Sequence, residues 1–162
     1  MKKFSLLMSV YGKDCPKLFH LALKSILDST IQPTEVVLVK DGPIDESLED
    51  VIDYFSQHLN LRIVKFNKNR GLHHALNHGL KMCSYDLVIR ADADDVNEKN
   101  RFKILLQYSN KYDLVGSYIR EYRDYFKTKH LHENTPTPDI DVPYVSPEEV
   151  SFINEEELFL DA

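Results

Sequence analysis

The residues best suited to chemistry in this sequence stand where an apolar run ends in carboxylates. The segment "DLVIRADADD", residues 86–95, closes with Asp92, Asp94 and Asp95. Carboxylate oxygens are the ligands that Mg²⁺ and Mn²⁺ prefer, usually through one or two carboxylates plus the phosphates of a substrate. If an extended strand continues through this segment, Asp92 and Asp94 point the same way and could share one ion. The alternative is that Asp95 or Asn97 only caps the helix that follows.

The elements that must position these acids alternate between apolar strands and amphipathic helices. The strands are predicted at residues 3–11, 34–40, 61–66, 86–91 and 113–122, and the helices at 17–29, 45–59, 72–83 and 97–109. The strands are continuous apolar runs, which favours a sheet that is buried on both faces. The predicted fold class is therefore α/β, a doubly wound, mainly parallel sheet with helices on both faces.

Polar residues gather at the carboxyl ends of four of these strands. They are Ser9 to Tyr11, Asp41 with Gly42, Asn67 to Gly71, and Asp92 to Asp95. Open parallel sheets bind their ligands beyond the carboxyl ends of the strands. The sequence therefore predicts one site built from all four loops.

Composition and missing motifs exclude several classes of protein. The chain has 162 residues and a net charge of −6, but residues 139–162 hold eight acids and no Lys or Arg. Residues 1–138 are nearly neutral, which argues against a nucleic-acid partner. The sequence has neither the G-x-x-x-x-G-K-[ST] phosphate loop nor a G-x-G-x-x-G dinucleotide motif nor a G-x-S-x-G elbow.

Membrane, disulfide and zinc patterns are also missing from the sequence. No apolar stretch approaches the roughly 20 residues that span a bilayer, so no integral membrane segment and no signal peptide are predicted. Cys15 and Cys83 are far apart and are predicted to be free thiols. His74 and His78 have helical metal-pair spacing, but no third ligand stands nearby.

Three segments together, taken in order and spacing, resemble family 2 glycosyltransferases. They are "SVYGKDCPKLFHLALKSILDSTIQPTEVVLVKDGPIDE", "NKNRGLHHALNHGL" and "LVIRADADDVNEKNRF". The resemblance covers about residues 3–125 and implies the GT-A fold of many bacterial enzymes of capsule, lipopolysaccharide and exopolysaccharide synthesis. It implies transfer of a hexose from a nucleotide-diphospho-sugar, typically UDP-linked, to a glycan or lipid-linked acceptor. The implied cofactor is Mn²⁺ or Mg²⁺, and the implied location is the cytoplasm, including the inner membrane face.

The resemblance also assigns roles to residues of the first two strand ends. Ser9, Val10 and Tyr11 match the loop that lines the nucleotide base in the family, although Tyr11 alone would equally suit a core or edge aromatic. Asp41 matches the acid that hydrogen-bonds the base. Its other interpretation is a turn residue before Gly42.

The remaining matches concern the diphosphate and the metal. Asn69, Arg70 and Gly71 match a helix start near the nucleotide, where backbone N–H groups and a basic side chain suit an anion; the alternative is a solvated Arg at an ordinary helix start. Asp92, Ala93 and Asp94 match the family's D-x-D, in which the two acids would bridge the metal to the β-phosphate. Arg101 also matches a recurrent position, either paired with the acidic loop or exposed.

The resemblance weakens towards the C-terminus. Inverting transfer needs a general base for the acceptor hydroxyl, and the family's later Asp or Glu has no counterpart that the sequence identifies. Residues 1–125 are predicted as the nucleotide-sugar domain, and 126–162 as a Pro-containing arm with an acidic tail. Three explanations stay open: a truncated frame, a part completed by another polypeptide, and a compact transferase with an unrecognised base. Truncation would expose the sheet edge and favour self-association.

Two functional classes follow, together with a weaker third. The first is a metal-dependent glycosyltransferase, and the second is a non-catalytic or truncated nucleotide-sugar-binding module. Turnover separates them, because only the enzyme would release UDP faster when an acceptor is supplied. The third is a sugar-phosphate nucleotidyltransferase, which needs a Gly-rich basic loop after the first strand, where this chain has only Gly12 and Lys13.

Overall fold

The computed structural model describes residues 2–119, so the predicted arm at 126–162 lies outside the described residues. Contacts divide the chain after Gln107 into two compact units. In the second unit a turn closes on the carbonyl of Tyr108, which accepts from the N–H groups of Lys111 and Tyr112 at 2.9 and 3.1 Å. Residues 113–119 form no strand, so the fifth strand predicted at 113–122 is wrong for this part.

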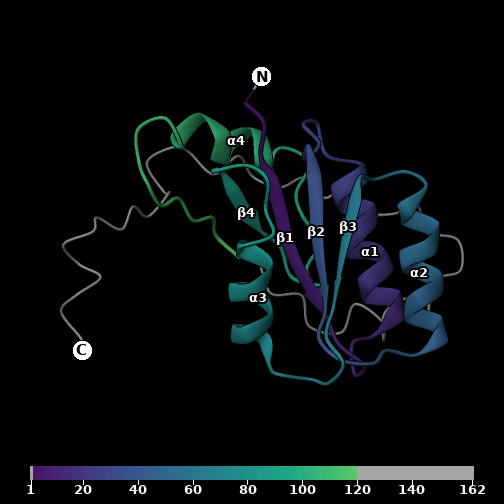
Figure 1. The fold of residues 1–162 in the computed structure, drawn as a ribbon. Helices are drawn as coiled ribbons and strands as arrows, with labels where there is room; N and C mark the ends of the chain where they lie inside the picture. The colour runs from purple at the N-terminus through teal and green to yellow at the C-terminus, as the bar shows by residue number, and fades with distance from the viewer. Residues whose placement is uncertain (1, 120–162) are drawn as a thin grey trace, which may run out of the picture. The chain divides into compact units, whose positions relative to one another are not determined.

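The first unit is built on four parallel strands in the order β3-β2-β1-β4 (Figure 1). Their bounds are Ser5–Val10 for β1, Glu35–Lys40 for β2, Leu61–Lys65 for β3 and Val88–Arg90 for β4. In the register of the sheet, Ser5 of β1 lies opposite Glu35 of β2 and Val88 of β4. Every residue of β2 is buried, which explains why its sequence is continuously apolar rather than alternating. The predicted α/β fold class is confirmed.

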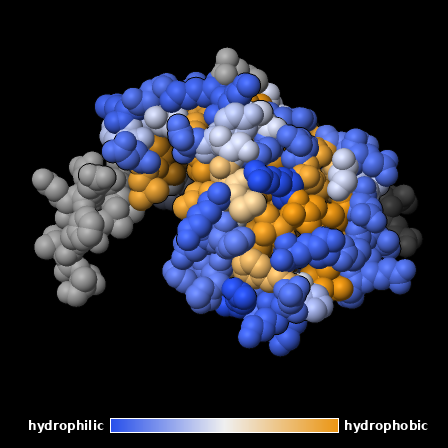
Figure 2. Space-filling view, viewed as in Figure 1, coloured by the Kyte–Doolittle hydropathy of each residue, from blue (hydrophilic) through white to orange (hydrophobic). Residues whose placement is uncertain are grey.

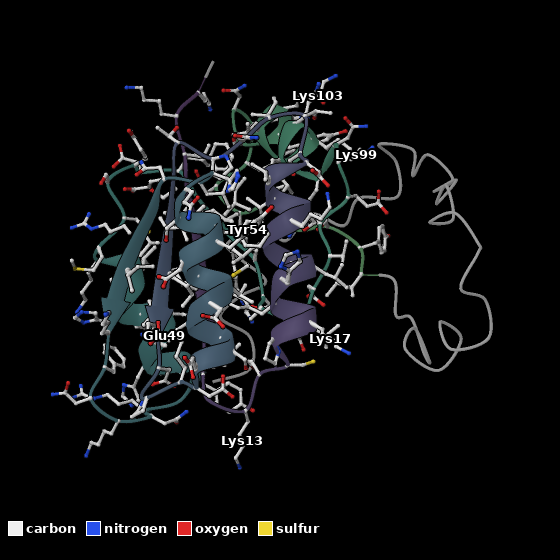
Figure 3. The ribbon with its side chains drawn as sticks, turned by 90° about the vertical axis from the view of Figure 1, so that its right-hand side faces the viewer. Lys13, Lys17, Glu49, Tyr54, Lys99 and Lys103 are labelled. Carbon is white, nitrogen blue, oxygen red and sulfur yellow. The ribbon has the colours of Figure 1, made fainter. Side chains whose placement is uncertain are left out.

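Helices cover both faces of this sheet. Their bounds are Pro16–Leu27 for α1, Glu46–Ser56 for α2, Leu72–Leu80 for α3 and Arg101–Tyr108 for α4. Helices α1 and α2 lie side by side on one face, while α3 lies on the other (Figure 1). Figure 3 views the α1–α2 layer from outside, with Lys17 at the start of α1 and Tyr54 on α2.

The packing of α3 follows from the alternation of side chains along the strands. Leu7, Val37 and Val39 point to one face of the sheet and form a buried cluster with Ala75 of α3. Gly79 brings the helix close, because a Cβ atom there would lie 2.5 Å from Cδ1 of Leu7. The small residues of the "LHHALNHGL" segment therefore let the helix seat against the sheet.

Apolar surface is gathered on the face that Figure 1 presents. Figure 2 shows hydrophobic residues over the middle of this face, beside α3, with hydrophilic residues around them. Val64 and Phe66, at the end of β3, pack only partly against the buried cluster. No helix in the described residues is both long enough and apolar enough to cross a bilayer.

Two predicted elements around the acidic segment are shorter than expected. The strand expected at 86–91 is β4, and backbone bonds extend its pairing with β1 to Leu87 and Ala91. The helix expected at 97–109 begins only at Arg101, because Asn97 is drawn into buried hydrogen bonds with Ser25 of α1. Residues 91–100 are therefore a loop held by tertiary contacts.

Candidate functional site

The candidate site lies where the strand order of the sheet reverses. From β1 the chain moves to β2 and β3 on one side and later returns to place β4 on the other side of β1. Such a switch point leaves a crevice beyond the carboxyl ends of the two flanking strands, where ligands of open parallel sheets bind. Here those ends are followed by Tyr11 and by Ala91 with Asp92. The acids therefore stand at the position that the fold provides for a ligand.

Asp41 joins three of the four predicted loops. It is only 4% exposed, and its backbone N–H donates to the carbonyl of Val10 at 2.8 Å. Its Oδ1 accepts from the N–H of Arg70 at 2.7 Å, and its Oδ2 accepts from the N–H of Gly71 at 2.8 Å. The structure therefore brings the predicted residues after β1, β2 and β3 together around one buried carboxylate.

Gly42 permits this close approach. Its φ of +93° is in the left-handed region, which agrees with the turn that the sequence predicts there. A Cβ atom at Gly42 would lie 2.5 Å from the backbone nitrogen of Asn69. The turn after β2 therefore touches the loop before α3 through backbone atoms, and only glycine fits between them.

The two residues just before α3 already donate to an anion of the protein itself. The N–H groups of Arg70 and Gly71 donate to Asp41, and Gly71 also donates to Oδ1 of Asn69 at 3.1 Å. The exposed guanidinium of Arg70 lies 5.2 Å from the ring centre of Phe66. These two N–H groups therefore serve the protein's own carboxylate, and any role for Arg70 towards a diphosphate belongs to its side chain.

The loop after β1 carries an acid that sequence reasoning overlooked. Ser9 is partly buried opposite Val39 in the sheet, and Tyr11 is 39% exposed, so it is not a core residue. Oδ2 of Asp14 accepts from the N–H of Tyr11 at 2.9 Å. Burial raises the pKa of Asp14, the bond from Tyr11 opposes this, and the charge of Asp94 raises the pKa further. The loops after β1 and β4 therefore lie within electrostatic reach of each other.

The D-x-D acids are not aligned by a strand. The chain turns at Ala93 and Asp94, so the expectation that strand alternation points Asp92 and Asp94 together is wrong. Ala93 is buried, Asp92 is partly buried and Asp94 is exposed. Asp92 instead pairs with Arg90, the last residue of β4, with Nε to Oδ1 at 2.9 Å and Nη2 to Oδ2 at 3.0 Å. The sequence contains a signal for this pair, because Arg90 and Asp92 carry opposite charges two positions apart.

Arg101 lies against the acidic loop and is not an exposed first-turn residue. Its Nη2 donates to the carbonyl of Arg90 at 3.0 Å, and its Nη1 donates to Oδ1 of Asn97 at 2.9 Å. Burial lowers the pKa of Arg101, while the charges of Asp95 and Asp92 oppose this shift. Asp95 does not cap α4 in the way the alternative interpretation required, since that helix begins at Arg101.

The loop keeps an excess of negative charge that would suit a divalent cation. Burial raises the pKa of Asp95, and the charges of Asp94 and Asp92 raise it further, against the lowering effect of Arg101 and Arg90. Asp94 is exposed, and within residues 2–119 no donor hydrogen-bonds its carboxylate, so its oxygens are open to a ligand. These donors fit Mg²⁺ or Mn²⁺, hard ions that bind through few carboxylates and complete their shell with water and phosphate oxygens.

The described residues do not form a metal site that is closed by protein ligands alone. Among residues 2–119, no group of three His, Cys, Asp or Glu side chains is placed to enclose a metal ion. His73 instead contacts Asn77, with 3.0 Å between Nε2 and the amide nitrogen, and His78 packs edge-on against Phe66. The histidines of α3 are therefore engaged in contacts of their own, away from the acidic loop.

Several glycosyltransferases resemble this chain in sequence. A UDP-Gal:alpha-D-GlcNAc-diphosphoundecaprenol beta-1,3-galactosyltransferase of Escherichia coli is 42% identical over 123 residues, covering 74% of this chain and 45% of that protein. The amylovoran biosynthesis glycosyltransferase AmsE of Erwinia amylovora is 36% identical over 129 residues, covering 78% and 48%. The chain thus spans about half the length of these relatives.

Solved structures show the same fold. The Staphylococcus aureus TarS 1–349 structure in complex with UDP-GlcNAc aligns with a TM-score of 0.60 at 25% identity, covering 69% of this chain and 32% of that one. The mannosyltransferase PcManGT of Pyrobaculum calidifontis, in complex with GDP-Man and Mn²⁺, aligns with a TM-score of 0.57 at 20% identity, covering 65% and 32%. The family model described as glycosyl transferase family 2 matches residues 5–157. With that match over nearly its whole length, the chain belongs to glycosyl transferase family 2.

Proposed function

We propose that this chain forms the donor-binding part of a metal-assisted glycosyltransferase that uses a UDP-sugar. The acceptor class is a lipid-linked or other glycan of cell-surface polysaccharide synthesis, and the reaction would take place at the cytoplasmic face of the membrane. The observation that supports this best is the buried Asp41, which gathers three strand-end loops beside the acidic loop. The names of the E. coli and E. amylovora relatives supply the substrate classes.

The nucleotide would be recognised by the loops that Asp41 holds together. A carboxylate offers about four lone-pair sites, so Asp41 can bind Arg70 and Gly71 and still accept a hydrogen bond from an N–H of uracil. The exposed ring of Tyr11 offers a flat apolar surface for the base, beside Ser9 and Val10. Because Asp41 is fixed by two backbone donors, it would need little reordering when the base binds.

The diphosphate would lie towards the acidic loop. The two strand spacings that separate β2 from β4 amount to roughly 10 Å, a span that a nucleotide can bridge. Asp92 and Asp94 would hold Mn²⁺ or Mg²⁺ there. The chemistry supplied by the bound ion would be neutralisation of the charge that develops on the departing diphosphate. The side chain of Arg70 could add positive charge from the other side.

Proton removal from the acceptor is assigned to no residue of 2–119, so a second candidate function stays in view. That candidate is a nucleotide-sugar-binding module without turnover, which would need only the donor-side loops that Asp41 gathers. Both functions require UDP binding that is promoted by metal. They separate when UDP release is measured with and without an added lipid-linked acceptor, because only the transferase accelerates with acceptor.

Calorimetric titration with UDP tests the donor site that both candidates share. Wild type should bind UDP more tightly with Mn²⁺ than with EDTA. Asp94→Ala should lose most of this gain, because it removes the open carboxylate of the loop. Asp86→Ala is the matched control, since Asp86 is an exposed acid just before β4, away from the strand's carboxyl end. Absent UDP binding, or binding that ignores both the metal and Asp94→Ala, would contradict the proposal.

A further inference from the structure

A buried polar contact ties the acidic loop to helix α1. Ser25 and Asn97 are 8% and 7% exposed. Oγ of Ser25 accepts from the backbone N–H of Asn97 at 2.9 Å and from its side-chain amide at 3.2 Å, and it donates to the carbonyl of Ala22 at 2.6 Å. A hydroxyl has one donor and two acceptor sites, so all of its capacity is used. No buried side-chain N or O atom in the described residues lacks a partner.

From this contact, hydrogen bonds continue to the first acid of the D-x-D. Oδ1 of Asn97 accepts from Arg101 at 2.9 Å, and Arg101 donates in turn to the carbonyl of Arg90 at 3.0 Å. The guanidinium of Arg90 then binds both oxygens of Asp92. An unbroken set of contacts therefore leads from Ser25 on α1 to the carboxylate of Asp92.

The loop needs such support because its own structure does not fix it. Residues 91–100 contain neither helix nor strand. They carry Asp92, Asp94 and Asp95, which repel one another. The guanidinium of Arg101 is a planar fork that donates in two fixed directions, so it sets the position of Asn97 relative to the end of β4. Moving either end would displace the carboxylates between them.

We propose that Ser25, Asn97 and Arg101 are positioning residues for the metal-binding carboxylates of the D-x-D loop. The inference rests on the proposed donor site and adds a prediction about how that site is maintained. Partners that orient ligating carboxylates typically contribute about 10–100-fold to metal affinity. Loss of the contact should therefore weaken the metal-dependent part of UDP binding, while the metal-independent part, held by Asp41, stays.

The chain offers a matched control on the same loop. The N–H and Oγ1 of Thr30 donate to the carbonyl of Lys99 at 2.9 and 3.0 Å. This contact also ties the loop to the end of α1, but it is exposed and lies farther along the loop from Asp92. In Figure 3, Lys99 lies at the opposite end of α1 from Lys13, which belongs to the loop after β1. Thr30→Ala therefore removes the bonds that the hydroxyl makes to Lys99 and Asn100. The backbone N–H bond to Lys99 stays, and the Ser25–Asn97 contact is not touched.

The experiment measures the affinity of the full chain for UDP in saturating Mn²⁺ and in EDTA. The quantity compared between variants is the affinity in Mn²⁺ divided by the affinity in EDTA. Ser25→Ala and Arg101→Lys should each lower this ratio by about tenfold or more, with the affinity in EDTA changed by less than about twofold. Thr30→Ala should keep the wild-type ratio. Arg101→Lys keeps the charge and loses the fork, so it provides the answer if Ser25→Ala fails to fold.

The possible outcomes distinguish a failure of the positioning role from a failure of the proposed donor site. A wild-type ratio well above one that both Ser25→Ala and Arg101→Lys retain would overturn the positioning role alone. An equal fall in Thr30→Ala would also overturn it, because the effect would then reflect general loosening of the loop. A wild-type ratio of one would overturn the proposed metal site and, with it, the inference.

Discussion

Arg90 holds Asp92 through two parallel hydrogen bonds, from Nε to Oδ1 at 2.9 Å and from Nη2 to Oδ2 at 3.0 Å. The two side chains are 53% and 36% exposed, so the pair contributes little to stability. Its geometry matters more, because a guanidinium fork fixes the plane of the carboxylate that it binds. Asp92 is therefore oriented before any ligand arrives, while Asp94 remains open.

Replacing Arg90 with Gln should weaken Mn²⁺-dependent UDP binding by about tenfold, because the carboxylate of Asp92 loses the partner that orients it. The free energy of unfolding should change by less than about 1 kcal/mol. Calorimetry and urea denaturation give the two values. Lys24→Gln is the control, since it breaks another exposed ion pair, with Asp28 on α1. Equal effects of both variants on UDP binding would contradict the role of Arg90.

Replacing Asp41 with Asn should lower both stability and nucleotide affinity. An amide offers one oxygen to the two N–H groups of Arg70 and Gly71 and turns its NH₂ group towards one of them. Leaving a buried donor without an acceptor costs about 1–3 kcal/mol of unfolding free energy. Affinity for UDP should fall by about tenfold, because the charged acceptor for the base is lost.

Asp45→Ala is the control for Asp41→Asn. Asp45 caps α2 by accepting from the N–H of Leu48 at 3.0 Å, so its loss should cost about 1 kcal/mol of unfolding free energy. Asp45 stands at the far end of the loop after β2, where its side chain accepts from Ser47 and Leu48 of α2, and UDP affinity should therefore stay at the wild-type value. A weakened UDP affinity in Asp45→Ala would show that lost stability alone explains the effect at Asp41.

The two glycines with positive φ should respond differently to alanine. Gly42 and Gly71 have φ values of +93° and +90°, so either substitution adds about 1–3 kcal/mol of backbone strain. At Gly71 a Cβ atom would meet nothing within 4 Å, whereas at Gly42 it would lie 2.5 Å from the nitrogen of Asn69. We expect Gly42→Ala to be the more destabilising in urea denaturation and to weaken UDP binding. Equal losses would show that the approach of the two loops is unimportant.

Glu35 should make stability depend on pH. Burial by itself raises the pKa of this carboxyl, but bonds from Ser5 and Ser84 and the charge of Arg62 outweigh it, so the pKa lies below its usual 4.5. Oε1 of Glu35 accepts from Oγ of Ser5 at 2.7 Å and from the N–H of Ser84 at 2.6 Å. A lowered folded-state pKa means that this stabilisation is complete above the unfolded-state pKa and is lost as the pH falls through the folded-state value.

Glu35→Gln should therefore be less stable than wild type at neutral pH, by about 1–3 kcal/mol for a buried contact. The difference between the two proteins should stay constant down to about pH 5.5 and shrink as the pH falls below about 4.5. Urea denaturation across this range measures it. Glu98→Gln, at an exposed glutamate, should track the wild-type curve. A difference for Glu35→Gln that does not shrink in acid would contradict the charge-based explanation.

The sheet and most of its helices could be predicted from the sequence, because the hydrophobic periodicity and composition of each segment favour one type of element. The continuous, β-branched apolar run before Asp41 predicts a strand covered on both faces, and β2 is buried throughout. The strand expected at 113–122 was wrong for 113–119, since a short run such as "DLVGSYI" has too little pattern to specify pairing. The start of α4 was placed too early because Asn97 bonds to Ser25, which stands 72 positions earlier in the chain.

Spacing and the local apolar pattern predict the parallel sheet and the four loops that carry polar residues, and three segments taken in order carry the resemblance to the family. The pairing of the side chains, by contrast, is visible only in the folded chain. Asp41 binds the backbone of Arg70 and Gly71, and Asp92 binds Arg90 rather than aligning with Asp94. Such pairings depend on which strand ends become neighbours and where each strand stops. Those are properties of the packed sheet, and no single segment of the sequence contains them.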